Sequence, residues 1–320
     1  MNVIDTHCDA LVKMQVSKRE KNQLLNYKDS RQLTSNFLEL QKGEVIVQFF
    51  AIFIKPYVPF EKKWDYALEQ IDIFHTEIIN KNPAMRHIKN WKEIENLKKG
   101  EIGAVLTLEG ADPFGRNLDK LDYLYRSGIL LIGLTWNHAN HCGDGAGVTN
   151  AGGLTSFGKE VIKRNNTQGV FTDVSHASVK GFWDTIEIAE FLIASHSNVR
   201  SICDHPRNLY DDQIISMIDR KGLIHVVYNP PFIKEKQNAT ISDLIKHIDH
   251  LCSLGGVNNI GFGSDFDGIK ATVNKLEKAS DYQNLINELL KFYSEDEVKG
   301  FAYKNFLRHR PLCTNNDRLL

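Results

Sequence analysis

Several short apolar runs of the sequence end in histidines or carboxylic acids, side chains that can bind metal ions and move protons. These residues are His7, Asp9, Glu109, His138, His176, His196 and Asp265. Imidazole and carboxylate groups without a thiolate suit zinc, and they can also hold manganese or cobalt. If the run ends converge in space, the set predicts metal-assisted hydrolysis.

His7 and Asp9 are separated by one residue at the end of an apolar run. Residues two apart on a strand face the same side, so both side chains can reach one ion. His247 and Asp249 have the same spacing but lie in a helical pattern, where residues two apart point about 200° apart. The first pair is therefore the metal candidate, and Cys8 between its members is expected to pack on the opposite face.

Each further candidate also has a purely structural explanation. Glu109 could pair with a lysine or arginine, and His176 and His196 could be core histidines bonded to the backbone. His138 could be a solvated loop residue, and Asp265 shares its GSDFDG segment with a second aspartate that could cap a turn. The joint pattern is harder to explain in this way. Two His/carboxylate clusters with one shared carboxylate predict a two-metal site holding a bridging hydroxide.

The elements that must position these residues follow a regular alternation of apolar runs and helical patterns. Eight strands are expected, at residues 3–5, 45–54, 104–108, 129–136, 170–174, 191–194, 223–228 and 260–263. Helices are expected at residues 64–80, 118–126, 157–168, 179–188, 211–220, 242–254, 282–292 and 296–307. This alternation favours a (β/α)₈ TIM-like barrel with its active site at the C-terminal ends of the strands. A doubly wound sheet fits less well, because THCDA rather than a glycine-rich loop follows the first run.

Composition limits the class of protein. The 320 residues carry a formal net charge of -1 and are 42% hydrophobic, which predicts one globular domain over residues 1–320 and no nucleic-acid partner. The longest apolar runs are about half of a membrane span, so no membrane partner is expected. Five cysteines without a CxxC pair favour a reducing compartment, and we expect a cytoplasmic protein.

Seven motifs follow one another between residue 4 and about residue 268. They are IDTHCD, LTLEGAD, LTWNHAN, GLTSFGKEVI, TDVSHAS, ASHSNVRSICDHPRNLYDDQI and IGFGSDFDG. In this order they resemble the membrane (renal) dipeptidase family, metallopeptidases with a barrel of the amidohydrolase superfamily. The chain looks more like the cytosolic bacterial members than the secreted, lipid-anchored mammalian ones, since we find neither a signal segment nor a hydrophobic C-terminal tail.

The resemblance implies roles for the metal candidates. His7 and Asp9 would bind one zinc ion, His176 and His196 would bind the other, and Glu109 would bridge the two. The implied reaction is the hydrolysis of dipeptides, including those with a D-residue at the C-terminal position. The resemblance also implies a homodimer.

The resemblance further implies substrate contacts. His138 would stabilise the oxyanion, Arg207 would pair with the substrate carboxylate, and Asp265 would handle the proton of the attacking water. Tyr228 is a weaker substrate-contact candidate, because the register of HVVYNPPFI against the family is ambiguous.

Alternatives remain open at this point. Arg207 could be a surface residue paired with Asp211 or Asp212. Because an N-acyl amino acid also carries a carboxylate, an amidohydrolase acting on N-acyl amino acids or cyclic amides is a second possible function. A binding protein built on an inactive barrel is a third.

Overall fold

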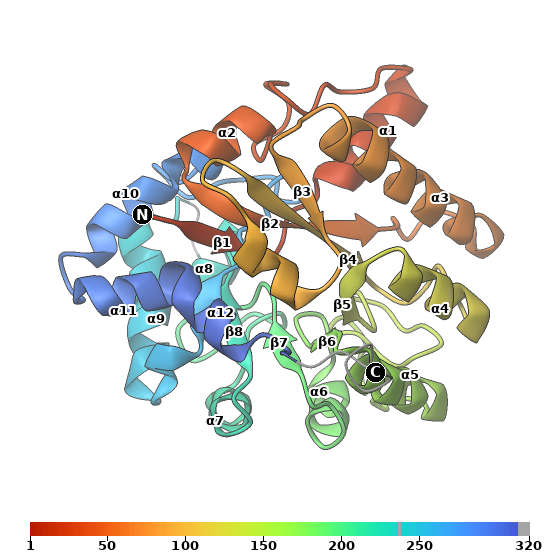
Figure 1. Ribbon diagram of the computed structural model, residues 1–320. Coiled ribbons are helices and arrows are strands. Elements are labelled where there is room, and N and C mark those ends of the chain that lie inside the picture. Colours follow the sequence, from red (N-terminus) through yellow and green to blue (C-terminus); the bar gives the residue numbers. More distant parts are fainter. Residues whose placement is uncertain (236–237, 313–320) are drawn as a thin grey trace.

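A parallel sheet forms the frame of the computed structural model, which describes residues 1–235 and 238–312 (Figure 1). In these residues the strands are β1 (Val3–Asp5), β2 (Val45–Phe53), β3 (Met85–Ile88), β4 (Ile102–Glu109), β5 (Ile129–Gly133), β6 (Phe171–Asp173), β7 (Leu192–Ala194), β8 (Leu223–Val226) and β9 (Ile260–Phe262). Eight of them close into a barrel in the order β1-β2-β4-β5-β6-β7-β8-β9, and β9 pairs with β1. The predicted (β/α)₈ barrel is confirmed.

The ninth strand, β3, lies outside the closed barrel. One edge of β4 pairs with β2 along its length, whereas the other edge pairs with β3 as far as Val105 and with β5 from Leu106 onward. The sequence analysis missed β3. Its four residues, MRHI, are buried only at the two ends, so they form no apolar run that would indicate a strand.

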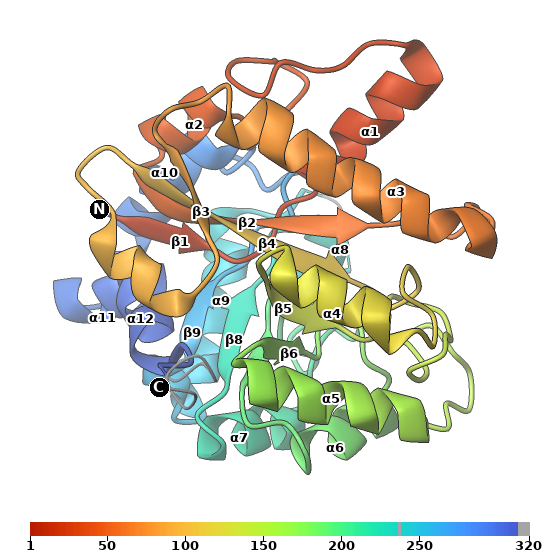
Figure 2. The same ribbon diagram turned by 45° about the vertical axis from the view of Figure 1, so that its right-hand side comes forward.

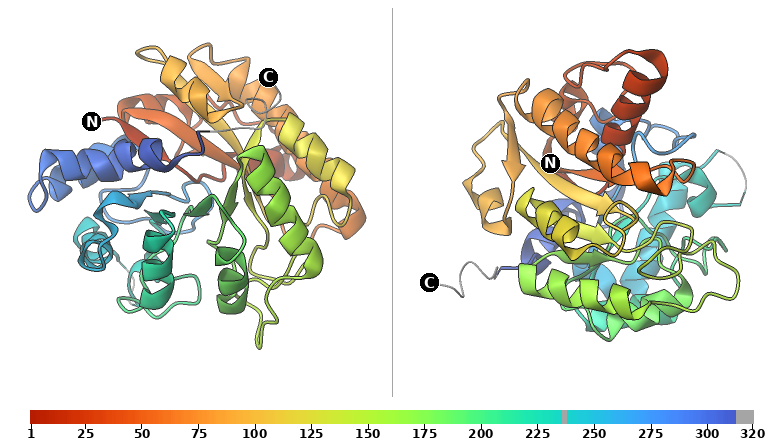
Figure 3. Two further views of the ribbon diagram at one scale, coloured as in Figure 1. Left: turned by 60° about the horizontal axis from the view of Figure 1, so that its bottom comes forward. Right: turned by 90° about the vertical axis from the view of Figure 1, so that its right-hand side faces the viewer.

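Helices surround the barrel on its outer side (Figures 2 and 3). They are α1 (Ala10–Lys21), α2 (Phe37–Lys42), α3 (Phe60–Ile73), α4 (Leu118–Arg126), α5 (Ser156–Gln168), α6 (Val179–Ile186), α7 (Asp211–Asp219), α8 (Pro230–Ile233), α9 (Ile241–Ser253), α10 (Tyr282–Leu289), α11 (Glu295–Lys299) and α12 (Asn305–His309). Short 3₁₀ turns are η2 (Trp91–Asn96), η3 (Gly256–Asn258) and η4 (Ala279–Asp281), and π-helical turns are η1 (Phe74–Ile79) and η5 (Gly300–Lys304).

The helix predictions succeed where an apolar stripe and a cap coincide. Thr155 caps α5 and Ser178 caps α6, each by accepting a bond from a backbone N–H three residues on. The sequence analysis missed α1, whose buried side chains lie in its first eight residues while its last turn is exposed. A helix that is buried at one end only carries no continuous stripe along its length.

The barrel interior and its N-terminal end are filled with apolar side chains. Phe49 of β2 and Phe171 of β6 meet Trp91 and Phe306, which come from η2 and α12. The ring centroid of Trp91 lies 5.3 Å from that of Phe171 and 5.6 Å from that of Phe306. The barrel is therefore a packed core, and side chains can meet a substrate only at its other end.

Two further expectations concern the whole chain. None of the helices in the described residues has the length and apolar character needed to cross a membrane. The single domain over residues 1–320 stays a prediction, since residues 313–320, including Cys313, lie outside the described part of the chain. The cysteines within that part are unpaired, and Cys8 is packed in the core as expected.

Candidate metal and active site

The predicted site residues gather at the C-terminal mouth of the barrel, because parallel strands all end on the same side. They are His7 and Asp9 after β1, Glu109 at the end of β4, His176 after β6, His196 after β7 and Asp265 after β9. Strands that are far apart in the sequence therefore supply one cluster. His247, which has the same spacing to Asp249 as His7 has to Asp9, lies on α9. Its ring bonds to the carbonyl oxygen of Ile233 and the backbone N–H of Val199.

Glu109 lies among three imidazole rings. Its Oε1 is 2.7 Å from Nε2 of His176 and 3.7 Å from Nε2 of His196. Its Oε2 is 3.7 Å from Nε2 of His7. The two oxygens of one carboxylate thus face histidines from different strands, which is the arrangement expected of a shared ligand.

The two aspartates complete the cluster around His7. Its Nε2 lies 4.0 Å from Oδ2 of Asp9 and 3.9 Å from Oδ1 of Asp265. Two sets of potential ligand atoms lie within 4.8 Å of one another: His7 with Glu109 and His196, and His7 with Asp9 and Asp265. Asp265 is therefore as close to His7 as the predicted ligand Asp9 is.

The polar atoms of this cluster fit divalent cations. Within the described residues, the buried atoms Nε2 of His7 and Oδ1 of Asp9 have no hydrogen-bond partner. The Nε2 atoms of His176 and His196 face each other at 3.0 Å. Buried polar atoms without partners are costly, and a cation that accepts their lone pairs would remove that cost.

The pKa values of the histidines favour the metal-binding form. Burial, with a smaller contribution from Arg207, lowers the pKa of His7 to about 3. Burial also holds the pKa values of His176 and His196 well below the ordinary value. Neutral imidazoles with free lone pairs therefore line the mouth at neutral pH.

The carboxylates show the opposite shift. Burial and the neighbouring carboxylates raise the pKa values of Asp9 and Glu109 well above the ordinary range. Burial raises the pKa of Asp265 to about 7, although Arg207 opposes the shift. Three buried acids in mutual repulsion gain from cations placed between them, since opposite charge favours the ionised form.

A glycine makes room for the aspartates. A Cβ on Gly268 would lie 2.0 Å from Oδ2 of Asp9 and 2.6 Å from Oδ1 of Asp265. Asp265 itself has a φ of 62°, a backbone conformation that most residues avoid. The second aspartate of the GSDFDG segment, Asp267, accepts hydrogen bonds from Thr34, Ser35 and Lys13, so its role is structural.

Arg207 is buried beside this cluster. Its side chain donates from Nη1 to the carbonyl oxygen of Ser175 and lies 5.5 Å from the centre of the Phe232 ring. The residue is 5% exposed, and its Nε and Nη2 have no partner within the described residues. The alternative of a surface arginine paired with Asp211 or Asp212 does not fit this burial.

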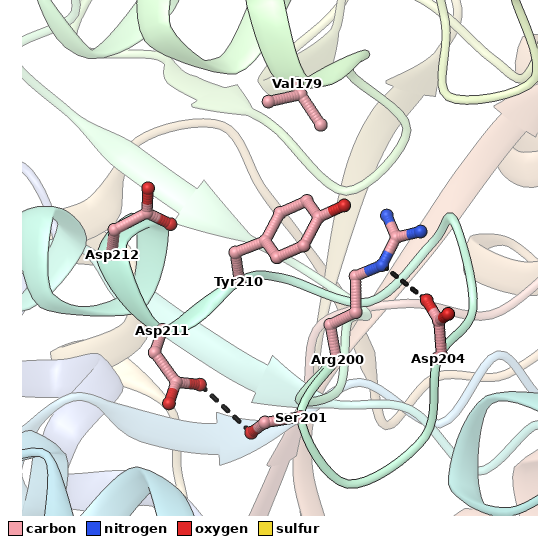
Figure 4. A pocket seen from close by; sticks show the side chains of 7 residues that line it. All are labelled: Val179, Arg200, Ser201, Asp204, Tyr210, Asp211 and Asp212. Carbon is pink, nitrogen blue, oxygen red and sulfur yellow. Dashed lines mark hydrogen bonds and ion pairs between the residues drawn. The ribbon is translucent and has the colours of Figure 1, made fainter.

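The arginine near those aspartates is Arg200. It donates to Asp204 at 2.8 Å and lies 4.4 Å over the ring of Tyr210 (Figure 4). An open cavity of about 830 Å³ surrounds it, lined by Val179, Arg200, Ser201, Asp204, Tyr210, Asp211 and Asp212. None of the predicted metal ligands lines this cavity, so it is separate from the cluster.

His138 lines a smaller cavity of about 250 Å³ with Trp136, Lys63 and Asp112 among its neighbours. The ring of Trp136 lies 5.4 Å from that of His138 and 5.9 Å from that of His176. Trp136, which lines the cavity, therefore lies beside both His138 and the candidate ligand His176.

Tyr228 is the candidate that the geometry supports least. It is fully buried, and its ring packs against Phe266 and Tyr282 in the core. Conversely, the sequence analysis missed Asn137, whose Oδ1 lies 2.8 Å from Nδ1 of His176. The only sequence signal for Asn137 is its place beside His138 in the TWNHAN motif.

Comparisons with known proteins identify the family of this chain. The family model "Membrane dipeptidase (Peptidase family M19)" matches residues 1–312. An uncharacterized dipeptidase of Schizosaccharomyces pombe is 29% identical, over 96% of this chain and 79% of that protein. Dipeptidase 3 of Mus musculus is 28% identical, over 96% of this chain and 63% of that protein.

Solved structures share the fold. A metallo peptidase from Rhodobacter sphaeroides, liganded with a phosphinate mimic of the dipeptide L-Ala-D-Ala, superimposes with a TM-score of 0.89 at 20% identity, over 97% of this chain and 99% of that chain. The M19 metallo peptidase described as dipeptidase AC gives a TM-score of 0.88 at 20% identity, over 98% and 99% of the two chains. With a family match across nearly its whole length, this chain belongs to the membrane dipeptidase family, peptidase family M19, and is a metallo-dipeptidase.

Proposed function

We propose that this enzyme hydrolyses dipeptides at a site that holds two divalent cations, with zinc as the expected metal. The observation that carries the proposal is the carboxylate of Glu109, whose two oxygens face His7 on one side and His176 and His196 on the other. Asp9 completes the proposed ligand set of His7, Asp9, Glu109, His176 and His196. Bound cations would activate a water molecule and polarise the peptide carbonyl.

The protein's own groups would handle charge and protons. Asp265 would accept the proton of the attacking water and return it to the leaving amine, which is general acid–base work. Its proximity to His7 supports this role. His138 would donate to the oxyanion that forms on the carbonyl oxygen. Its position beside Trp136, whose ring also lies beside the candidate ligand His176, supports that assignment.

Arg207 would bind the free carboxylate of the substrate. Support comes from its burial and from its two unpartnered nitrogens in the described residues. A planar guanidinium suits bidentate pairing with a carboxylate. Recognition of that group beyond the scissile bond would make the enzyme reject longer peptides.

The substrate range would include dipeptides with a D-residue at the C-terminal position. The ligand of the Rhodobacter sphaeroides structure, a mimic of L-Ala-D-Ala, supports this extension. Parallel assays of L,L, L,D and D,D dipeptides with added zinc, manganese or cobalt would test both substrate and metal.

A second candidate activity is deacylation of N-acyl amino acids, because Arg207 would bind their carboxylate equally well. Hydrolysis of a dipeptide and of its N-acetylated form separates the two activities. We expect the free dipeptide to be hydrolysed faster. Faster cleavage of the acetylated compound would favour the second activity, and metal analysis of the purified protein would test the proposed pair of cations.

For the cellular setting we propose the cytoplasm and a homodimer. Support for a reducing compartment comes from the unpaired cysteines in the described part of the chain. Cell fractionation would test the location, and sedimentation of the purified protein would test the dimer.

A further inference from the structure

The carboxylate of Asp173, at the end of β6, collects hydrogen bonds from two serines. Its Oδ1 accepts from the backbone N–H of Ser175 at 3.0 Å, from Oγ of Ser175 at 2.7 Å and from the N–H of Ser195 at 3.0 Å. Its Oδ2 accepts from Oγ of Ser195 at 2.5 Å. All four groups donate to Asp173, so its carboxylate acts only as an acceptor in this arrangement.

The direction of these bonds determines how Ser195 can bond to His196. Ser195 is fully buried, and its single hydroxyl hydrogen is given to Asp173. Its Oγ also lies 2.7 Å from Nδ1 of His196. With its hydrogen already used, the hydroxyl can only accept from the ring. Nδ1 of His196 therefore carries the proton, and Nε2 keeps a free lone pair.

We propose that Asp173 and Ser195 are positioning residues: the two successive hydrogen bonds from His196 to Ser195 and from Ser195 to Asp173, called the relay below, fix the tautomer of His196 that presents Nε2 to a cation. This inference rests on the proposed metal-binding role of His196. Ser175 assists the same arrangement from the other side, since its Oγ donates to Asp173 and accepts the backbone N–H of His196 at 3.0 Å. Both the ring and the backbone of His196 are thus held by groups bonded to Asp173.

The second histidine of this pair is held differently. Nδ1 of His176 meets Oδ1 of Asn137 at 2.8 Å, and an amide side chain carries no net charge. The hydroxyl that accepts from Nδ1 of His196 is itself bonded to the carboxylate of Asp173. A hydrogen-bond partner supported by a carboxylate makes an imidazole a stronger donor to metal than a neutral amide does. We therefore expect the two imidazoles, which face each other at 3.0 Å, to differ in basicity, with His196 as the stronger ligand.

The main test compares Ser195→Ala with Ser195→Thr, which retains a hydroxyl. Metal affinity is measured by chelator competition, and the absorption spectrum of the cobalt-loaded enzyme reports the ligand field. Removing such a supporting group costs roughly 10–100-fold in metal affinity. We expect that loss at one of the two ions in Ser195→Ala, together with a changed cobalt spectrum, and a substantial recovery in Ser195→Thr.

A matched control is Ser197→Ala. Ser197 is also fully buried beside His196, but its Oγ has no hydrogen-bond partner in the described residues. We expect this variant to keep the metal affinity and cobalt spectrum of the wild type. Equal losses in Ser195→Ala and Ser197→Ala would overturn the relay, because they would reflect packing alone.

A measurement on the wild-type enzyme tests the tautomer directly and does not depend on whether a variant folds. Nitrogen NMR of the histidine rings in the metal-free enzyme should show His196 with its proton on Nδ1, and a proton on Nε2 would overturn the proposal. If the wild type binds two ions and Ser195→Ala binds them equally well, the relay is refuted while the proposed function stands. A wild type that binds no metal would refute the proposed function, and with it the role of the relay.

Discussion

The two ends of the barrel are built from the same strands and differ in almost every physical property. At the N-terminal end, Phe49, Phe171 and Phe306 pack around Trp91, whose indole N–H is satisfied by the carbonyl oxygen of Gly169. The C-terminal mouth instead gathers buried acids, neutral imidazoles and an arginine, several of whose atoms have no partner within the described residues. The N-terminal end contributes stability, whereas the mouth keeps costly polar groups in place for chemistry.

A comparison of two buried histidines shows that burial alone does not identify a ligand. Burial lowers the pKa of both His225 and His7 to about 3. His225 is bonded through Nδ1 to Thr6, and a Cβ on Gly261 would lie 2.2 Å from its Nε2. Among the described residues, no carboxylate is bonded to His225. What distinguishes His7 is the set of carboxylates around its free nitrogen.

The largest expected effect comes from Glu109→Gln at the mouth. An amide bridges two cations poorly, so both ions should bind weakly. We expect kcat/KM to fall by more than the roughly 10²–10⁴-fold worth of one acid–base group. Metal analysis and dipeptide hydrolysis measure the result, and a folded variant with two ions and full activity would contradict the shared role of Glu109.

Asp265→Asn should separate chemistry from metal binding. The substitution removes the proposed proton acceptor and leaves the proposed ligands in place, so kcat should fall by about 10²–10⁴-fold while most metal is retained. Steady-state kinetics and metal content are measured on the same preparation. Loss of metal in proportion to activity would make Asp265 a ligand instead.

At the N-terminal end of the barrel, Phe306→Ala should lower the stability of the protein without changing its metal content or activity. Phe306 is 2% exposed, and truncating a buried phenylalanine costs about 3–5 kcal/mol of unfolding free energy. Denaturant unfolding measures that cost, with Phe292→Ala as the control, because Phe292 is 69% exposed. A stable Phe306→Ala variant that loses its metal would show that the two ends are not independent.

The smallest expected effect concerns Arg207 and the length of the substrate. Amidating the C-terminus of a dipeptide should raise the barrier by a few kcal/mol, because a buried charge would lose its partner. Arg207→Lys should also lower kcat/KM for the dipeptide, since an ammonium cannot pair with a carboxylate in a bidentate manner. The control is Arg200→Lys, in the open cavity separate from the cluster, which should change kcat/KM little. Similar kcat/KM for the dipeptide and its amide would exclude Arg207 as the length gauge.

Local pattern in the sequence determined most of the architecture and the types of side chain at the site. Continuous apolar runs indicate buried strands because both faces of a barrel strand are covered. Residues such as His7 and Glu109 could be predicted because they stand where those runs end. The neighbouring β3 could not be predicted, since its four residues are stabilised by pairing with β4 and carry no run of their own.

Only the tertiary structure decided which of those side chains meet and in what state. Glu109 faces His7, His176 and His196 because barrel closure brings together strand ends that are far apart in the sequence. The local sequence around Arg207 is equally compatible with a surface position, because the burial of this side chain depends on neighbours from other loops. The proton on His196 likewise depends on a carboxylate from a different strand. Contact, burial and protonation arise from packing between distant segments, and local spacing does not encode them.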